Sequence, residues 1–97
     1  MNDERRDRGV MLRGVDRTYR IDCRSLNALA RLEDETGMSL AAVLEAIRED
    51  DPPDLNLARD FLGAVLIDPP NATPEELAAI LEDIGGMPIL RAAAAGI

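Results

Sequence analysis

Residues 25–49 read SLNALARLEDETGMSLAAVLEAIRE, and this stretch predicts two amphipathic helices joined at Gly37. The first helix repeats leucine every three residues, and the second spaces its apolar residues by three and four. These apolar positions are Leu26, Leu29 and Leu32 in the first helix and Leu40, Val43, Leu44 and Ile47 in the second. Ser25 and Ser39 are suitable N-caps, because a serine hydroxyl accepts a hydrogen bond from a free amide of the first turn. Each helix therefore has one apolar stripe that must be buried.

The chain before these helices predicts a β-hairpin. Residues 10–12 and 18–23 form two short apolar segments, and the second alternates apolar with charged residues as a half-buried strand does. Gly14 and Asp16 supply the residues of a turn between them. Because a lone hairpin is marginal in water, we expect its apolar side chains to pack on the helices. These side chains are Val10, Leu12, Tyr19 and Ile21.

The chain after residue 49 predicts two more helices and a short last segment. Asp54 opens a helix over residues 55–67, which is apolar around most of its circumference and is therefore the central one, with Phe61 in the core. Thr73, Pro74 and Glu76 form a capping box with proline at the first helical position. The buried stripe of that helix is Leu77, Ile80, Leu81 and Ile84. The last segment has helical spacing in Leu90, Ala93, Ala94 and Ile97, and we expect it to fray or to need a partner.

Together these segments predict a single α+β domain over residues 10–97 that is mostly α, with an N-terminal β-hairpin followed by a compact bundle of four to five short helices. Residues 1–9 are dominated by charge and have no apolar period, so we expect a disordered N-terminal arm. No run approaches 18 apolar residues and the N-terminus has no apolar core typical of a signal peptide, so the cytoplasm is the default compartment and no membrane partner is expected.

The charge distribution argues against a nucleic-acid partner. Residues 1–24 hold seven Arg against five acidic residues, whereas residues 25–97 hold four Arg against fourteen. The acidic body repels phosphate. The two helices around Gly37 resemble a DNA-reading helix-turn-helix only in outline, because the outer face of the second helix has Ala41, Glu45 and Glu49 where such proteins use cationic and amide side chains.

The residue inventory also argues against an enzyme. The chain has no His and no Lys, and Cys23 is its single cysteine, so it holds neither a nucleophile–base pair nor a zinc ligand cluster. No glycine-rich stretch predicts a phosphate site. Carboxylates at residues 33–35 and 49–54 are the remaining candidates, but they do not have the spacing of a metal-binding loop. We therefore assign no catalytic residue, no cofactor-binding residue and no metal ligand.

A set of short motifs resembles the small tail proteins of bacterial gene transfer agents and related tailed phages, a family described as tail assembly chaperones and also as tail tube components. The resemblance spans residues 9–86. Its motifs are Val10 to Leu12, Gly14, Tyr19-Arg20-Ile21, Leu26, Leu29, Leu32-Glu33, Gly37, Ser39-Leu40, Leu57, Phe61-Leu62-Gly63-Ala64, Thr73-Pro74-Glu75-Glu76-Leu77 and Gly85. The chain departs from the family at its end, where members continue into a longer final helix.

The resemblance implies a non-enzymatic helper in the cytoplasm of a bacterial host, which binds the helical, apolar tape-measure protein while the tail tube assembles around it. A structural tail component found in the particle is the alternative, and an acidic regulatory or DNA-binding protein comes after it. Apolar residues of the second helix and the last segment are the candidate partner-binding residues, and those of the last segment also allow a homo-oligomer. The candidates are Leu40, Leu44, Ile47, Ile89, Leu90, Ala93 and Ile97.

Overall fold

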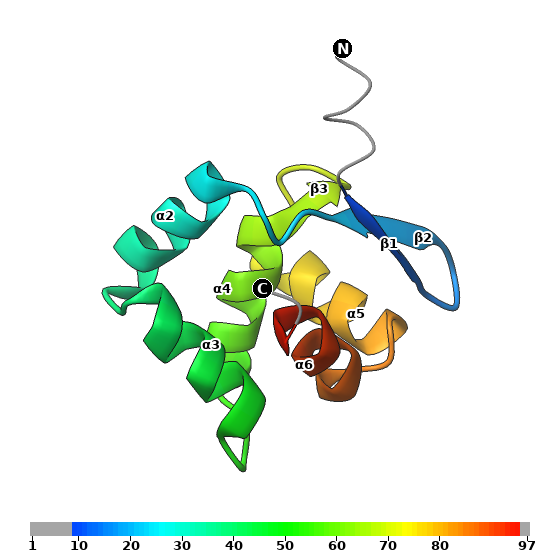
Figure 1. Cartoon of the computed structure of the whole chain (residues 1–97). Coiled ribbons are helices and arrows are strands. Elements are labelled where there is room, and N and C mark those ends of the chain that lie inside the picture. The colour runs from blue at the N-terminus through cyan, green and yellow to red at the C-terminus, as the bar shows by residue number, and fades with distance from the viewer. Residues whose placement is uncertain (1–8, 96–97) are drawn as a thin grey trace.

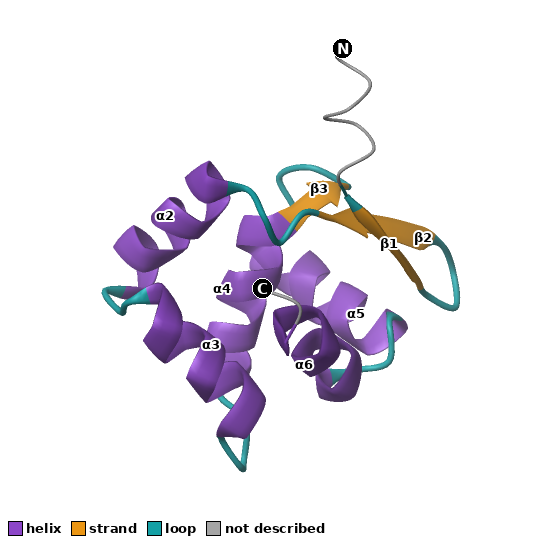
Figure 2. Ribbon diagram, viewed as in Figure 1, coloured by secondary structure: helices purple, strands orange, loops and turns teal. Residues whose placement is uncertain are grey.

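The computed structural model describes residues 9–95 and shows a small antiparallel sheet packed beside five short helices (Figures 1 and 2). In chain order the elements are β1 (Val10–Arg13), β2 (Thr18–Ile21), α2 (Leu26–Thr36), α3 (Leu40–Glu49), α4 (Leu55–Val65), β3 (Leu66–Asp68), α5 (Pro74–Asp83) and α6 (Met87–Ala95). The predicted fold class, mostly α with an N-terminal hairpin and a bundle of short helices, is confirmed. The predicted arm at residues 1–9 and the candidate Ile97 fall almost entirely outside the described residues.

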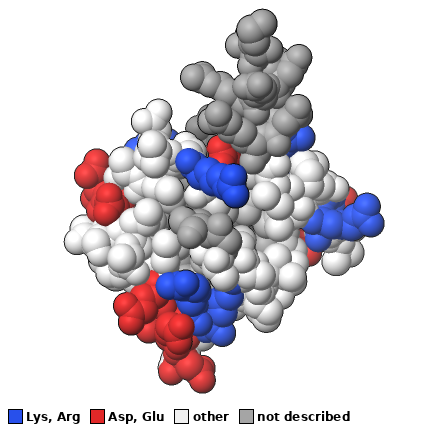
Figure 3. All heavy atoms as spheres, viewed as in Figure 1, with Lys and Arg blue, Asp and Glu red and all other residues white. Residues whose placement is uncertain are grey.

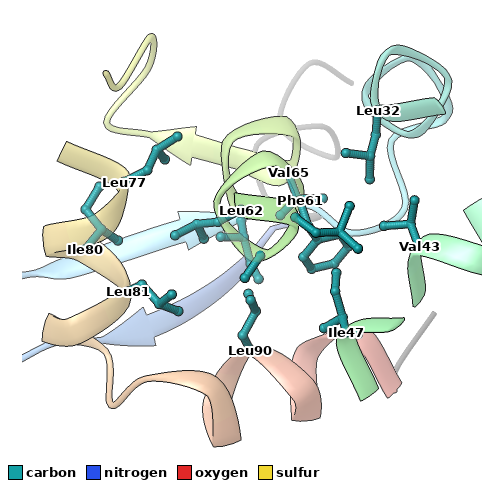
Figure 4. Packing of buried hydrophobic residues seen from close by; sticks show 14 of the residues in the cluster. Leu32, Val43, Ile47, Phe61, Leu62, Val65, Leu77, Ile80, Leu81 and Leu90 are labelled. Carbon is teal, nitrogen blue, oxygen red and sulfur yellow. The ribbon is translucent and has the colours of Figure 1, made fainter. Parts of the chain in front are cut away.

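Helix α4 is the centre of the bundle, as its apolar circumference predicts. It packs against α2, α3, α5 and α6, and Phe61 is 0% exposed. In Figure 4 the Phe61 ring lies beside Val43 and Ile47 of α3, while Leu81 points inward from α5. A helix that contacts four others has little surface left for solvent, so its sequence has to be apolar nearly all round.

The helix boundaries follow the predicted capping residues. The hydroxyls of Ser25 and Ser39 accept from the amides of Ala28 and Ala42 at 3.3 and 3.2 Å, and Gly37 ends α2 with a φ of +69°. The Asp54 carboxylate accepts from the Leu57 amide, and the capping box of Thr73 and Glu76 is complete in both directions. These bonds satisfy amides that a helix start otherwise leaves without a partner.

The sheet has a third strand, so the predicted helix over residues 55–67 is wrong at its end. Helix α4 stops at Val65, and β3 pairs antiparallel with β2 to give the order β1-β2-β3. Residues 66–68 pair with β2 instead of continuing the helix, and the residue before a proline is disfavoured in the α region, so Asp68 could not have extended it. Strand β2 also ends two residues early at Ile21, and the next amide, of Asp22, donates to the Val65 carbonyl at 2.7 Å.

Two residues predicted to be buried are exposed. Leu26 is 81% exposed although Leu29 and Leu32 are buried. An α-helix turns about 100° per residue, so Leu26 lies about 120° around the helix from Leu32, and an unbroken spacing of three does not keep to one face. Val10 is 60% exposed because β1 is the edge strand, where only Leu12 packs against the core.

The carboxylate of Asp83, the last residue of α5, holds the hairpin turn. It accepts the Tyr19 hydroxyl at 2.7 Å and the amides of Val15 and Asp16 at 2.9 and 3.2 Å. The Tyr19 hydrogen bond, aided by the two amides, lowers the pKa of Asp83, and the same bond raises the pKa of Tyr19. Gly14 belongs to this arrangement because a Cβ there would overlap the Asp83 carboxylate. The hairpin is therefore fastened to the helices at its tip as well as through β3.

Candidate partner-binding surface

A groove lies along α3, with α6 at its edge. It has a volume of about 610 Å³ and is lined by Ala41, Leu44, Glu45, Arg48, Glu49 and Ala94. Leu44 and Ala94 belong to or pack against the core, whereas Ala41 and the two glutamates are exposed. The groove thus has a few small and medium apolar side chains on its floor and a charged wall of Glu45, Arg48 and Glu49 on the α3 side.

The seven candidate partner-binding residues lie in several different places, and only one of them lines this groove. Leu40, Leu44 and Ala93 are half-buried and pack at the margin of the core. Ile47 and Leu90 are buried, because the inward faces of α3 and α6 meet α4. A partner cannot reach these two side chains in this fold, and they are better described as core residues.

Ile89 is 39% exposed, but it is not among the residues that line the groove. Ile97 lies outside the described part of the chain. Leu44 is therefore the one candidate that lines the groove itself, and the structure adds Ala41, Glu45, Arg48, Glu49 and Ala94 to it. The spacing of the charged residues on the outer face of α3 is visible in the sequence, but the groove exists only because α6 packs beside α3.

Helix α6 is attached to α3 by an arginine that the sequence pattern does not single out. Arg91 Nε donates to the Ile47 carbonyl at 2.9 Å, and its Nη2 donates to the Asp50 carbonyl at 2.7 Å. These carbonyls lie at the C-terminal end of α3, where the helix leaves acceptors free and the dipole favours a cation. With Leu90 and Ala94 buried on the same helix, the described part of the last segment packs on the chain's own core.

A second depression lies between α4 and α5 and has mostly apolar walls. Its volume is about 460 Å³, and its lining includes Leu55, which is 57% exposed, together with Leu81 and Met87. The two helices approach closely at Gly63, where a Cβ would lie 2.9 Å from Leu77 Cδ1. The depression lies at the opposite end of the pair, near the start of α4 and the end of α5.

A third depression, of about 310 Å³, is polar and lies between α2, α4 and the loop after β3. Its cations already have partners: Arg31 lies 3.8 Å from Glu35, and Arg59 donates to Asn56. Paired, solvent-exposed charges of this kind leave little net field for a small charged ligand.

The carboxylates considered for catalysis serve structural roles where the structure gives them contacts. Glu33 accepts the Leu40 amide at 2.8 Å and so caps α3, and Asp54 caps α4. Within residues 9–95 no group of three or more His, Cys, Asp or Glu side chains could hold a metal ion. Burial raises the pKa of the Cys23 thiol to about 11, so it is a protonated, weakly nucleophilic group at neutral pH.

Comparison of the chain with protein-family models, curated proteins and solved structures gave no match. None of the helices in the described part of the chain has the length and apolar character needed to cross a membrane. The class of protein that the fold and site define is a small acidic domain with a groove beside α3 that is lined by both apolar and charged side chains.

Proposed function

We propose that this protein is a non-enzymatic tail assembly chaperone of a phage or gene transfer agent, which binds the tape-measure protein during tail assembly. The proposal rests on the motifs of residues 9–86 that resemble this family. The groove between α3 and α6 supports it, because an amphipathic helix docks by laying its apolar face into such a groove.

The observation that carries the proposal is the coincidence of that groove with the candidate helix. Leu44, one of the three candidate partner-binding residues on α3, lines this groove. Two of the carboxylates considered for catalysis, Glu33 and Asp54, are occupied in capping, which favours a binding role over a chemical one.

Co-expression tests the function directly. The chain is expressed together with the tape-measure protein encoded in the same gene cluster, and the soluble fraction of that protein is measured with and without it. We expect the tape-measure protein to become soluble and to co-purify with the chain. If it stays equally insoluble and nothing co-purifies, the chaperone function is refuted, and recovery of the chain from purified mature particles would favour the structural role instead.

A further inference from the structure

The charged wall of the α3–α6 groove contains two glutamates and one arginine, and the glutamates lie at an unusual place on their helix. Glu45 and Glu49 line the groove in the C-terminal half of α3, and Asp50 and Asp51 follow directly. Figure 3 shows acidic and basic side chains gathered over this end of the helix. The C-terminus of a helix carries negative partial charge, so carboxylates there add to the potential instead of compensating it.

Two arginines offset this potential only in part. Arg48 is exposed and its Nε donates to the Leu44 carbonyl at 3.3 Å, while Arg91 is bound to the two carbonyls at the end of α3. Both guanidinium groups thus form hydrogen bonds with backbone carbonyls in the C-terminal half of α3 or directly after it. Glu45 and Glu49 have no described hydrogen bond or ion pair, and their carboxylates face solvent beside the apolar floor.

From this combination we infer that the groove binds a cationic amphipathic helix, with its apolar side chains on Ala41 and Leu44 and its Lys or Arg side chains against Glu45 and Glu49. The inference takes the identity of the partner from the proposed function. It adds the chemical character of the segment of the partner that binds in the groove. An acidic helix would be repelled by both glutamates. A second copy of this chain is also disfavoured, because residues 25–97 hold fourteen acidic residues against four Arg.

Two synthetic peptides test the charge preference. Helix α3 has 10 residues and spans about 15 Å, so peptides of about 14 residues cover the groove. Both carry the same leucine stripe at helical spacing, one with lysine and the other with glutamate beside it. We expect the lysine peptide to bind in fluorescence anisotropy with an affinity that falls as salt rises, and the glutamate peptide to bind at least tenfold more weakly.

Paired variants locate the site. Glu45→Gln with Glu49→Gln should weaken the lysine peptide by about three- to thirtyfold, because each exposed ion pair contributes modestly. Asp34→Asn with Glu75→Gln removes the same charge from exposed positions that do not line the groove and should leave the affinity within about twofold. Ala41→Arg should block the groove, whereas Ala79→Arg, at an exposed alanine of α5, should not.

Three results would overturn the inference: no binding of either peptide, equal binding of both, or equal weakening by the two double variants. Failure of this inference can be distinguished from failure of the proposed function by repeating the co-expression test with these variants. If the tape-measure protein co-purifies equally with the wild type and with Glu45→Gln/Glu49→Gln, the chaperone function stands and the groove is not its site. If it co-purifies with neither while the lysine peptide still binds, the proposed function fails and the binding of a cationic helix in the groove remains.

Discussion

Truncation of Leu90 tests whether α6 is an integral part of the core. Its side chain is 0% exposed and packs in the cluster formed around α4. Replacing a fully buried leucine by alanine costs about 2 to 5 kcal/mol, from lost burial and from the cavity that remains. A typical domain has about 5 to 15 kcal/mol of stability in all. For a chain of this size each kcal/mol lowers Tm by about 4 to 8 °C, so we expect Leu90→Ala to melt at least about 8 °C below the wild type.

The neighbouring residue supplies the control. Ile89 is 39% exposed on the same helix, so Ile89→Ala loses only part of a side chain's burial, about 1 kcal/mol. Both variants are compared by circular dichroism in thermal and urea melts. If Leu90→Ala melts together with Ile89→Ala and the wild type, α6 does not contribute to the core, and the groove between α3 and α6 loses its second wall.

Four further changes test other parts of the fold. Phe61→Ala should cost about 3 to 5 kcal/mol and leave the chain nearly unfolded by circular dichroism, and a Tm shift below about 3 °C would contradict the central place of α4. Gly14→Ala should displace the Asp83 carboxylate from the hairpin turn, so faster hydrogen exchange is expected at the Val15 amide, and unchanged exchange would refute the clamp. Because the pKa of Asp83 is lowered in the folded state, its contribution is complete above its unfolded pKa of about 4 and is lost as the pH falls through the lower, folded value. The Tm difference between the wild type and Asp83→Asn should therefore shrink on acidification from pH 6 to pH 3, and a constant difference would contradict this assignment. Thr73→Ala removes one side of a complete capping box and should cost about 1 kcal/mol in a urea melt, whereas no measurable change would show that α5 starts independently of its cap.

Local signals in the sequence predict the helix starts and the identity of the central helix. Ser39, Asp54 and Thr73 cap helices because each needs only an amide three residues further along the chain. Phe61 is buried because its helix is apolar nearly all round, which follows from spacing alone. Properties that depend on a few neighbouring residues can thus be predicted from the sequence.

Contacts between distant segments cannot be predicted in the same way. Tyr19 and Asp83 are 64 residues apart, and an aspartate at the end of a helix looks like any other solvated carboxylate. Arg91 reaches carbonyls 41 and 44 residues earlier, and backbone carbonyls carry no sequence signal at all. The third strand is not predicted because Leu66 and Ile67 continue an apolar helical pattern. Only the two prolines that follow indicate that the helix ends earlier.

The same reasoning explains why the candidate site is only partly predictable. An apolar stripe does not distinguish a core residue from a docking residue, since both need a buried side chain, and Ile47 proves to be core while Leu44 lines the groove. The two kinds of residue lie on different faces of α3. Val43 and Ile47 point inward, and Ala41 and Glu45 lie on the exposed side. Changes at the exposed positions should therefore alter the proposed binding with little effect on packing. Loss of binding in Ala41→Arg with an unchanged melt would separate the groove from the core, which no substitution at Ile47 can do.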